Sequence, residues 1–156
     1  MKKLLRTIAL HVSTFGPLGY LPAPGTWGSL SALPLIVWFS RYMMTYEMQT
    51  IVIMLLILAV YGIITYALPV LPPKYDPQEV ILDEVLGMFI VFMGMPLTPM
   101  TLLLGFLYFR IFDIFKPLGI DYLQALPGAV GIVADDIVAG IFAHLALTVT
   151  LSLTGL

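Results

Sequence analysis

The sequence contains no cysteine and very little charge. The absence of Cys among its 156 residues excludes disulfide bonds, thiolate metal sites and catalysis by a cysteine nucleophile. Only 10% of the residues are charged, against roughly 25% in an average soluble chain. The formal net charge is −2 and no basic patch of the kind that nucleic acids require is visible, so we expect no nucleic-acid partner.

Apolar sequence takes the place of the missing charge. Hydrophobic residues make up 60% of the chain, and the mean hydropathy is +1.03. The composition therefore predicts an integral membrane protein, and the length has room for one domain over 1–156. The first apolar stretch is interrupted by His11 and Ser13 and continues into a Pro/Gly-rich segment. We therefore expect no removable signal peptide.

The apolar runs predict an all-α fold, a small polytopic membrane helix bundle with about five spans. A span needs about 20 helical residues. We place the spans near 28–46, 49–68, 79–95, 98–116 and 131–154. Arg41 interrupts the first, which spans only if this side chain snorkels to the membrane surface. An N-terminal cytoplasmic segment and a loop precede the first span.

The basic residues predict the orientation of the bundle. In a five-span chain most of them lie on one side of the membrane, and Arg41 alone lies towards the other. The first group is Lys2, Lys3, Arg6, Lys74 and Lys116. The positive-inside rule places this group in the cytoplasm and the C-terminus outside. We therefore expect Lys74 and the 117–130 connection to face the cytoplasm, and the 95–99 turn to face outward.

Two acidic pairs are expected at one shallow depth on the cytoplasmic side. Asp83 and Glu84 lie about one turn into the third span, and Asp135 and Asp136 about one turn into the fifth. A helix dipole stabilises one acid by ~0.3–1 kcal/mol, less than a second, adjacent carboxylate costs in hydrocarbon. Four carboxylates at one level repel unless a cation or protons intervene. With no Cys and no clustered His, oxygen ligands favour Mg²⁺, so these four residues predict a magnesium site.

Small residues extend from these acids along the same helix faces. Asp83, Gly87 and Gly94 share one stripe, as do Asp136, Gly140 and Ala143. Small-residue stripes let membrane helices approach closely, so we expect the acids to face a helix interface. Packing alone also explains these glycines.

The segment YFRIFDIFKP, 108–117, carries Arg110, Asp113 and Lys116 on one polar stripe. A guanidinium fork suits a phosphate group better than a lone ammonium does, so the stripe indicates a phosphate site. The alternative is a helix end with an internal salt bridge, from which Lys116 reaches the membrane surface.

The segment PAPGTWGSL, 22–30, precedes the first predicted span. Its prolines and glycines, opening a helix, suit a loop of backbone N–H groups that binds phosphate. The alternative is an ordinary capping turn with Thr26 or Ser29 as the N-cap, and spacing alone favours this alternative. His11 and His144 are interpreted as structural.

Four ordered segments together resemble the phosphatidylglycerophosphatase A family. They are PAPGTWGSL, DPQEVILDEVLG (76–87), FRIFDIFKPLGI (109–120) and LPGAVGIVADDIVAG (126–140). The resemblance covers about residues 19 to 143 and implies a Mg²⁺-dependent phosphatase of the bacterial inner membrane. Its implied reaction converts phosphatidylglycerophosphate to phosphatidylglycerol, with the active site facing the cytoplasm.

The resemblance also implies the site residues. As catalytic or metal-binding residues it gives Asp83, Glu84, Asp113, Asp135 and Asp136, with Mg²⁺ on all of these except Asp113. As substrate-binding residues it gives Arg110 and Lys116, together with Gly25, Thr26, Gly28 and Ser29 from the 24–29 loop, which begins at Pro24. Asp113 would orient Arg110 or serve as another ligand.

Three other classes of protein compete with this interpretation. An ion-coupled transporter also carries intramembrane acids, but it needs polar residues across the whole membrane. The second alternative is another lipid-phosphate enzyme, but the repeated-Asp pattern of CDP-alcohol phosphotransferases is absent, and so are the Lys/Arg and His motifs of the phosphatidic acid phosphatase type. A structural protein would not need four acids at one level. The sequence leaves the oligomeric state open.

Overall fold

The computed structural model describes residues 2–42, 45–71 and 77–155, and Lys74 lies outside the described residues. Over these ranges the chain is helical and contains no strand, which confirms the all-α prediction. The major helices are α1 (Lys2–Ser13), α2 (Pro24–Ser40), α3 (Tyr46–Ala67), α4 (Leu82–Val91), α5 (Pro99–Phe115), α6 (Ile120–Gln124) and α7 (Ala129–Thr154). Short 3₁₀ turns η1 (Leu18–Tyr20), η2 (Leu68–Val70) and η3 (Pro117–Gly119) connect some of them.

Each of the five predicted spans falls on a helix, but the predicted count of five spans is not confirmed. In the described chain, two helical stretches are long and apolar enough to cross a membrane, Tyr46–Val70 and Ala129–Thr154. Helix α4 has ten residues and is about 15 Å long, half of a bilayer core. Apolar sequence continues on both sides of α4 without helical structure. Hydropathy alone does not distinguish a full-length span from a short helix with such flanks.

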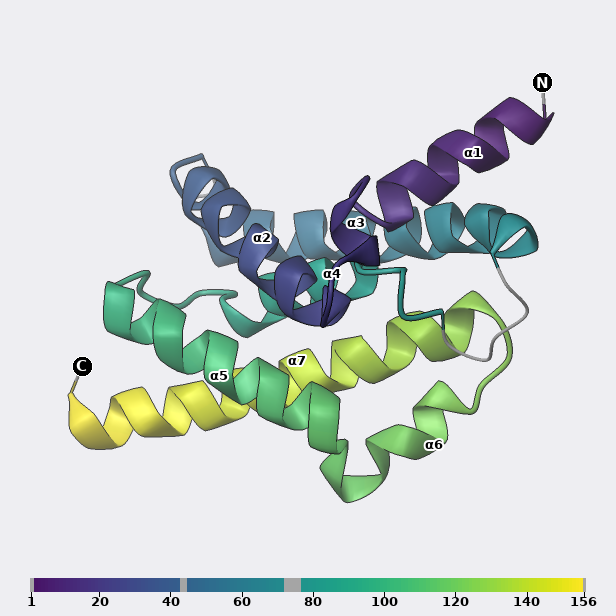
Figure 1. The fold of residues 1–156 in the computed structure, drawn as a ribbon. Helices are drawn as coiled ribbons and strands as arrows, with labels where there is room; N and C mark the ends of the chain where they lie inside the picture. Colours follow the sequence, from purple (N-terminus) through teal and green to yellow (C-terminus); the bar gives the residue numbers. More distant parts are fainter. Residues whose placement is uncertain (1, 43–44, 72–76, 156) are drawn as a thin grey trace.

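Helix α4 occupies the centre of the bundle (Figure 1). It packs against α2, α3, α5 and α7, and eight of its ten residues are buried. A helix that is apolar on every side is expected to be enclosed by others. Around it, Met88 and Val91 contact a core that includes Phe109, Ala139 and Ala143, all fully buried. The central position of α4 places its first turn, which carries two carboxylates, inside the protein.

The crossing of α4 and α7 depends on two glycines. A Cβ atom on Gly140 would lie 2.7 Å from the carbonyl oxygen of Gly87. A Cβ atom on Gly87 would lie 2.9 Å from the carbonyl oxygen of Asp136. The predicted close approach along these stripes is therefore confirmed for Gly87 and Gly140. It is wrong for Gly94, which lies beyond the end of α4 in a left-handed conformation.

The outer surface of the bundle is rich in large apolar side chains. On α3, Met54, Leu55 and Leu58 are each at least 60% exposed. On α7, Leu145 and Val149 are more than half exposed. Water disfavours such a surface whereas lipid does not, so the two candidate spans and their exposed faces indicate a membrane protein.

Helix α1 was not anticipated from the sequence, which predicted only a cytoplasmic segment. It packs along α3, and Ala9 and Ser13 are buried there. The carbonyl oxygen of Ser13 accepts a hydrogen bond from the backbone N–H of Ile81 at 2.9 Å. Since Ile81 immediately precedes α4, this bond joins the end of α1 to the start of the central helix.

Candidate active site

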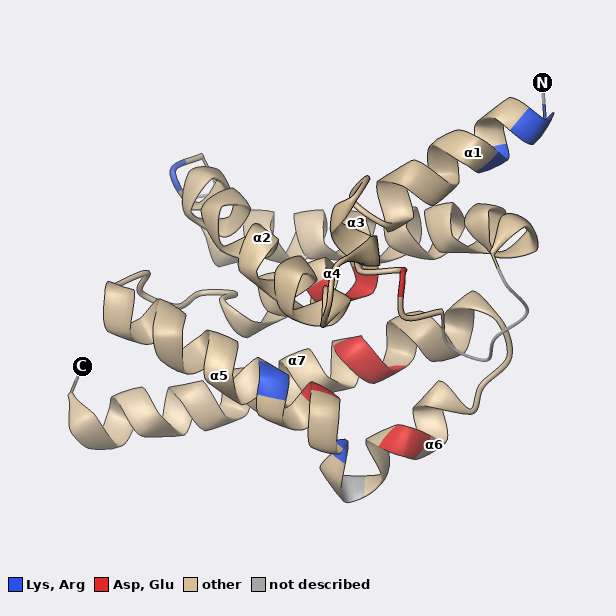
Figure 2. Ribbon diagram, in the orientation of Figure 1, with Lys and Arg blue, Asp and Glu red and all other residues tan. Residues whose placement is uncertain are grey.

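A polar pocket of about 270 Å³ lies between the first turns of α2 and α4, the last turns of α5 and the second turn of α7. Figure 2 shows that acidic and basic positions of α4, α5 and α7 lie near one another in the middle of the molecule. The pocket is lined by Ala23, Pro24, Gly25, Gln78, Val80, Asp83, Glu84, Arg110, Asp113, Lys116, Asp135 and Asp136. All seven charged residues that the sequence predicted for the site therefore meet in one pocket.

Three of the predicted carboxylates form a close group. One oxygen from each of Asp83, Glu84 and Asp136 lies within 4.8 Å of the other two. Asp83 is 5% exposed and Asp136 is 4% exposed, so water screens their mutual repulsion poorly. Helical geometry explains the meeting: the first turn of α4 and the second turn of α7 face each other beside Gly87 and Gly140.

The donor set of this group fits a hard divalent cation. Glu84 Oε2 and Asp136 Oδ1 are buried, and neither has a hydrogen-bond partner among the described residues. A buried acceptor with no donor costs about 1–3 kcal/mol, and more when it is charged. Oxygen-only ligation is typical of Mg²⁺ and Ca²⁺ sites. The group therefore has both the ligand chemistry and the unmatched acceptors that a Mg²⁺ site requires.

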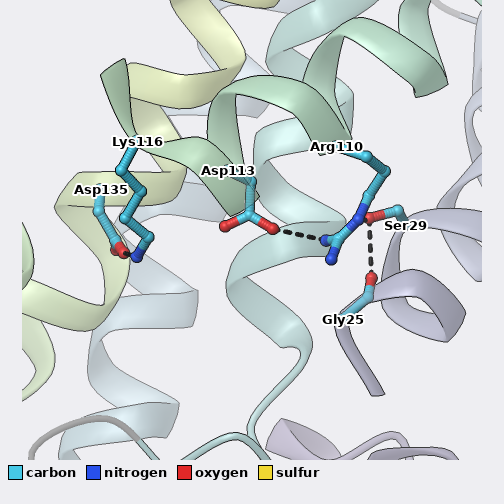
Figure 3. A network of polar contacts seen from close by, with 6 residues as sticks. All are labelled: Gly25, Ser29, Arg110, Asp113, Lys116 and Asp135. Carbon is cyan, nitrogen blue, oxygen red and sulfur yellow. Dashed lines mark hydrogen bonds and ion pairs between the residues drawn. The ribbon is translucent and has the colours of Figure 1, made fainter. Parts of the chain in front are cut away.

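Asp135 takes a different position from its neighbour Asp136. Its Oδ2 pairs with the ammonium group of Lys116, which follows the last residue of α5 (Figure 3). Adjacent residues on a helix point about 100° apart, so Asp136 faces α4 while Asp135 faces α5. Lys116 itself has a left-handed backbone, with a φ of +44°. Of the four predicted metal ligands, the structure thus gathers three and pairs the fourth with a cation.

Arg110 is held by a chain of polar contacts (Figure 3). Its Nη1 donates to Asp113 Oδ2 at 2.6 Å and to Ser29 Oγ at 3.4 Å. The Ser29 hydroxyl in turn donates to the carbonyl oxygen of Gly25 at 2.8 Å. Arg110 Nε is buried and has no acceptor within the described part of the chain. The guanidinium is therefore fixed in place while part of its donor capacity remains available.

Gly25 allows α2 to lie close to both the Glu84 carboxylate and the Arg110 guanidinium. A Cβ atom at this position would lie 2.4 Å from Glu84 Oε1 and 3.1 Å from Arg110 Nη1. Any side chain here would displace one of these groups. The glycine lets the backbone of α2 form one wall of the pocket.

The predicted loop at 24–29 is wrong, because α2 already begins at Pro24. Proline is favoured at the first helical position, and the preceding Ala23 has a left-handed backbone with no side-chain cap. Thr26 and Ser29 therefore lie inside the helix, and the alternative that either one is the N-cap is also wrong. Gly25 lines the pocket together with Pro24.

The other residues of this segment do not line the pocket. The backbone N–H of Thr26 donates to the carbonyl oxygen of Ala23. Gly28 packs against Ile81, and Ser29 is fully buried behind Arg110. Phosphate binding by Thr26, Gly28 or Ser29 stays a prediction, and the location of these residues away from the pocket lining does not favour it.

Gln78 and Val80 line the pocket but were not predicted as site residues. Both lie within the segment 76–87 that carried the family resemblance, and this location could have identified them as candidates. His144 lies outside the pocket, and its Nδ1 is 3.0 Å from the carbonyl oxygen of Val91. That contact agrees with the structural interpretation of this histidine.

The charges in the pocket are unbalanced. Five carboxylates face two cations, Arg110 and Lys116. A pocket with this excess of negative charge repels a phosphate unless further positive charge is bound. The arrangement therefore suits a reaction in which a divalent cation and a phosphate group bind side by side.

Comparison with known proteins gives a consistent result. Residues 11–151 match the family described as Phosphatidylglycerophosphatase A. Proteins named phosphatidylglycerophosphatase A from Escherichia coli and Haemophilus influenzae are 34% and 33% identical to the chain. These matches cover 76% and 90% of the chain, and 68% and 86% of the respective relatives.

A third relative carries a different name. A Bacteroides thetaiotaomicron protein named "Putative phosphatidylinositol-3-phosphatase" is 32% identical over 84% of the chain and 86% of its own length. No solved structure matches the chain. The family match favours an enzyme over the transporter and structural alternatives. The chain belongs to the phosphatidylglycerophosphatase A family, and it is a phosphatase.

Proposed function

We propose that the chain is a Mg²⁺-dependent lipid phosphatase that hydrolyses phosphatidylglycerophosphate to phosphatidylglycerol and inorganic phosphate. The family match and the names of two relatives support the substrate. The observation that carries the proposal is the pocket in which three clustered carboxylates lie beside an oriented arginine and a lysine. A lipid phosphomonoester has the charge and the exposed oxygens that such a pocket is suited to bind.

The metal site of this proposal consists of Asp83, Glu84 and Asp136. These residues would hold Mg²⁺, which when bound would supply positive charge to the phosphoryl oxygens and would lower the pKa of a bound water. Asp135, through its pair with Lys116, is assigned instead to positioning that lysine. This assignment narrows the four ligands expected from the sequence to the three that approach one another.

The remaining residues bind the phosphate and stabilise its charge. Arg110 donates to the phosphoryl oxygens, and Asp113 holds the guanidinium in the required direction. Lys116 stabilises the negative charge that grows on the phosphate and the leaving oxygen. Water attacks phosphorus, the ester P–O bond breaks, and the lipid leaves with a hydroxyl group. A pocket carboxylate that does not bind metal accepts the proton from water and returns it to the leaving oxygen, which becomes the hydroxyl group of the lipid.

The same proposal includes a membrane topology. The single domain spans the bacterial inner membrane about five times, through α2, α3, the segment 79–95 that contains the short helix α4, α5 and α7, with the pocket open to the cytoplasm. Support comes from the basic residues: α1, which carries Lys2, Lys3 and Arg6, and the end of α2, which Arg41 follows, lie on opposite sides of the molecule (Figure 1). The positive-inside rule assigns the first group to the cytoplasm.

Cysteine labelling tests this topology in a chain that has no cysteine of its own. In intact cells, a membrane-impermeant reagent should label Thr154→Cys but not Tyr122→Cys. The opposite pattern would place the pocket outside the cell.

A substrate panel tests the reaction. The purified chain in detergent is given phosphatidylglycerophosphate, phosphatidic acid or phosphatidylinositol 3-phosphate, with Mg²⁺ or with a chelator, and phosphate release is measured. We expect the fastest release from phosphatidylglycerophosphate and none with the chelator. Preference for the inositol lipid, as the name of the Bacteroides relative suggests, would replace the substrate but keep the chemistry. Full activity with the chelator would show that the reaction does not need Mg²⁺.

A further inference from the structure

Helix α1 has two chemically different faces that the active site does not use. Leu4, Ile8 and Val12 recur every four residues and form an apolar stripe, with Leu5 beside it. They are 64%, 51%, 42% and 46% exposed, respectively. The other face carries Lys2, Lys3 and Arg6, all exposed. A basic amphipathic helix of this kind is typical of a segment that lies at a membrane surface.

The attachment of α1 to the bundle leaves the apolar stripe uncovered. The helix packs on α3 through the side that includes Ala9 and Ser13, both buried. Figure 1 shows its N-terminal end projecting away from the bundle. No described residue covers Leu4 or Ile8, so their apolar side chains are open to a partner.

The neighbouring surface of α3 indicates what that partner is. α1 lies against α3 and the η2 turn at its end. In this part of α3, Leu58 is 68% exposed, and Tyr61 and Tyr66 are each 43% exposed. Tyr66 lies near the end of the candidate span Tyr46–Val70, and exposed tyrosines at such a position are typical of the membrane–water boundary. The stripe on α1 therefore continues a surface that already faces lipid.

We propose that α1 is an interfacial anchor that binds anionic lipid headgroups while its apolar stripe enters the boundary of the acyl chains. The charge distribution selects anionic lipid over neutral lipid. Three of the seven Lys and Arg residues lie within the first six positions of a chain whose net charge is −2. Each basic residue near an anionic surface strengthens binding roughly fivefold.

The anchor is joined to the pocket by backbone contacts. The hydrogen bond between Ser13 and Ile81 links the last turn of α1 to the residue before α4, whose first turn carries Asp83 and Glu84. The position of α1 at the headgroups therefore sets the depth at which these carboxylates lie. This anchor does not depend on which lipid phosphate the pocket hydrolyses.

Site-directed fluorescence tests the anchor. An environment-sensitive fluorophore is attached to Leu4→Cys on the apolar face, or to Thr7→Cys on the polar face as its matched control. The protein is reconstituted in vesicles of phosphatidylcholine alone or mixed with phosphatidylglycerol, with and without a lipid-borne quencher. We expect strong quenching at position 4 in the mixed vesicles, weaker quenching in phosphatidylcholine, and little at position 7 in either.

Charge variants show whether the basic residues cause this difference. Lys2→Gln, Lys3→Gln and Arg6→Gln together should lower the ratio of docked to undocked α1 by roughly 100-fold and remove the response to phosphatidylglycerol. Arg41→Gln, an exposed cation at the far end of the molecule, should leave the response unchanged.

Two results would overturn the anchor. Equal quenching in both kinds of vesicle would eliminate the anionic selectivity, and lipid-independent self-quenching would identify a second copy of the chain as the partner. Phosphate release in detergent, measured on the same variants, reports separately on the proposed phosphatase.

Discussion

The two ends of α2 and α4 form two different pockets. Their first turns line the charged pocket of about 270 Å³. Their last turns, with the start of α3, line a much smaller apolar crevice of about 50 Å³, where Ile36, Phe39, Ile53, Phe89 and Phe92 meet. Helices of similar overall hydrophobicity thus build a polar, negatively charged cavity at one end and a hydrocarbon-like crevice at the other.

This comparison separates packing from chemistry. At the apolar end, neighbouring side chains fill space, so a change of similar volume is tolerated. At the charged end, Arg110 and Lys116 each pair with one carboxylate, and the other three carboxylates lie close to one another. Replacement of one charged group therefore changes the electrostatic balance of its neighbours. We therefore expect substitutions at the two ends to differ far more in their effect on turnover than in their effect on folding.

The largest effect is expected at Asp136. Asp136→Asn removes a charged member of the carboxylate group and should lower phosphate release by roughly 10²–10³-fold, the range for loss of a group that stabilises transition-state charge. The rise in melting temperature on adding Mg²⁺ should shrink, because stabilisation by a ligand depends on its affinity. Both quantities are measured on the purified chain in detergent.

Two further variants control this experiment. Asp121→Asn, at an exposed position on α6, should change neither quantity. Asp135→Asn should lower activity by disturbing Lys116 but keep the Mg²⁺ stabilisation. If Asp135→Asn and Asp136→Asn lose the stabilisation equally, the four-ligand site expected from the sequence is right and the three-carboxylate site is wrong.

The next effect is expected at Arg110. Arg110→Lys keeps the charge but removes the fork that reaches both Asp113 and the phosphate. Loss of one charge-assisted hydrogen bond, about 1.5–3 kcal/mol, corresponds to roughly a 10- to 100-fold fall in kcat/KM. Arg41→Lys serves as the control. Unchanged kcat/KM in Arg110→Lys would make Arg110 a structural residue.

A smaller effect is expected where the helices cross. Gly87→Ala places a methyl group 2.5 Å from the Phe109 ring and 2.9 Å from the Asp136 carbonyl oxygen. The overpacking should destabilise the chain by about 1–3 kcal/mol and lower activity by displacing Asp136. Gly62→Ala on α3, where nothing lies within 4 Å, should instead be neutral or stabilising by up to about 1 kcal/mol. Thermal melting and phosphate release distinguish the two.

The smallest effect on turnover is expected in the apolar crevice. Ile53→Val removes one methylene group from a buried side chain and should lower stability by about 0.5–1.5 kcal/mol. Phosphate release should stay at the level of the unaltered chain. A loss of activity as large as that of Gly87→Ala would show that the crevice contributes to the reaction, and the contrast between the two ends would fail.

The sequence predicted the members of the charged pocket but not their partners. Seven charged residues could be assigned to one depth because helical spacing and span boundaries determine depth. Which of two adjacent acids meets α4 and which meets Lys116 depends on the rotation of α7 about its axis. That rotation is set by the contact between Gly87 and Gly140, which a single sequence indicates without giving its angle.

Three features of the fold were not predicted from the sequence, each for a local reason. The start of α2 was readable, since Pro24 suits the first helical position, but the glycines that follow suggested a loop. Helix α1 was also readable from the spacing of Leu4, Ile8 and Val12, although the His and Ser interruptions obscured it. The short length of α4 was not readable, because apolar residues continue beyond both of its ends.

Under the proposed mechanism, function and stability oppose each other at Lys116. Its left-handed backbone costs about 1 kcal/mol or more relative to a glycine, the residue that usually ends a helix in this conformation. A glycine there would recover that free energy but would remove the ammonium group from the pocket. The strained backbone at the end of α5 therefore lowers stability but places a cation beside Asp135. Selection for thermal stability alone would be expected to yield a more robust but inactive protein through this one position.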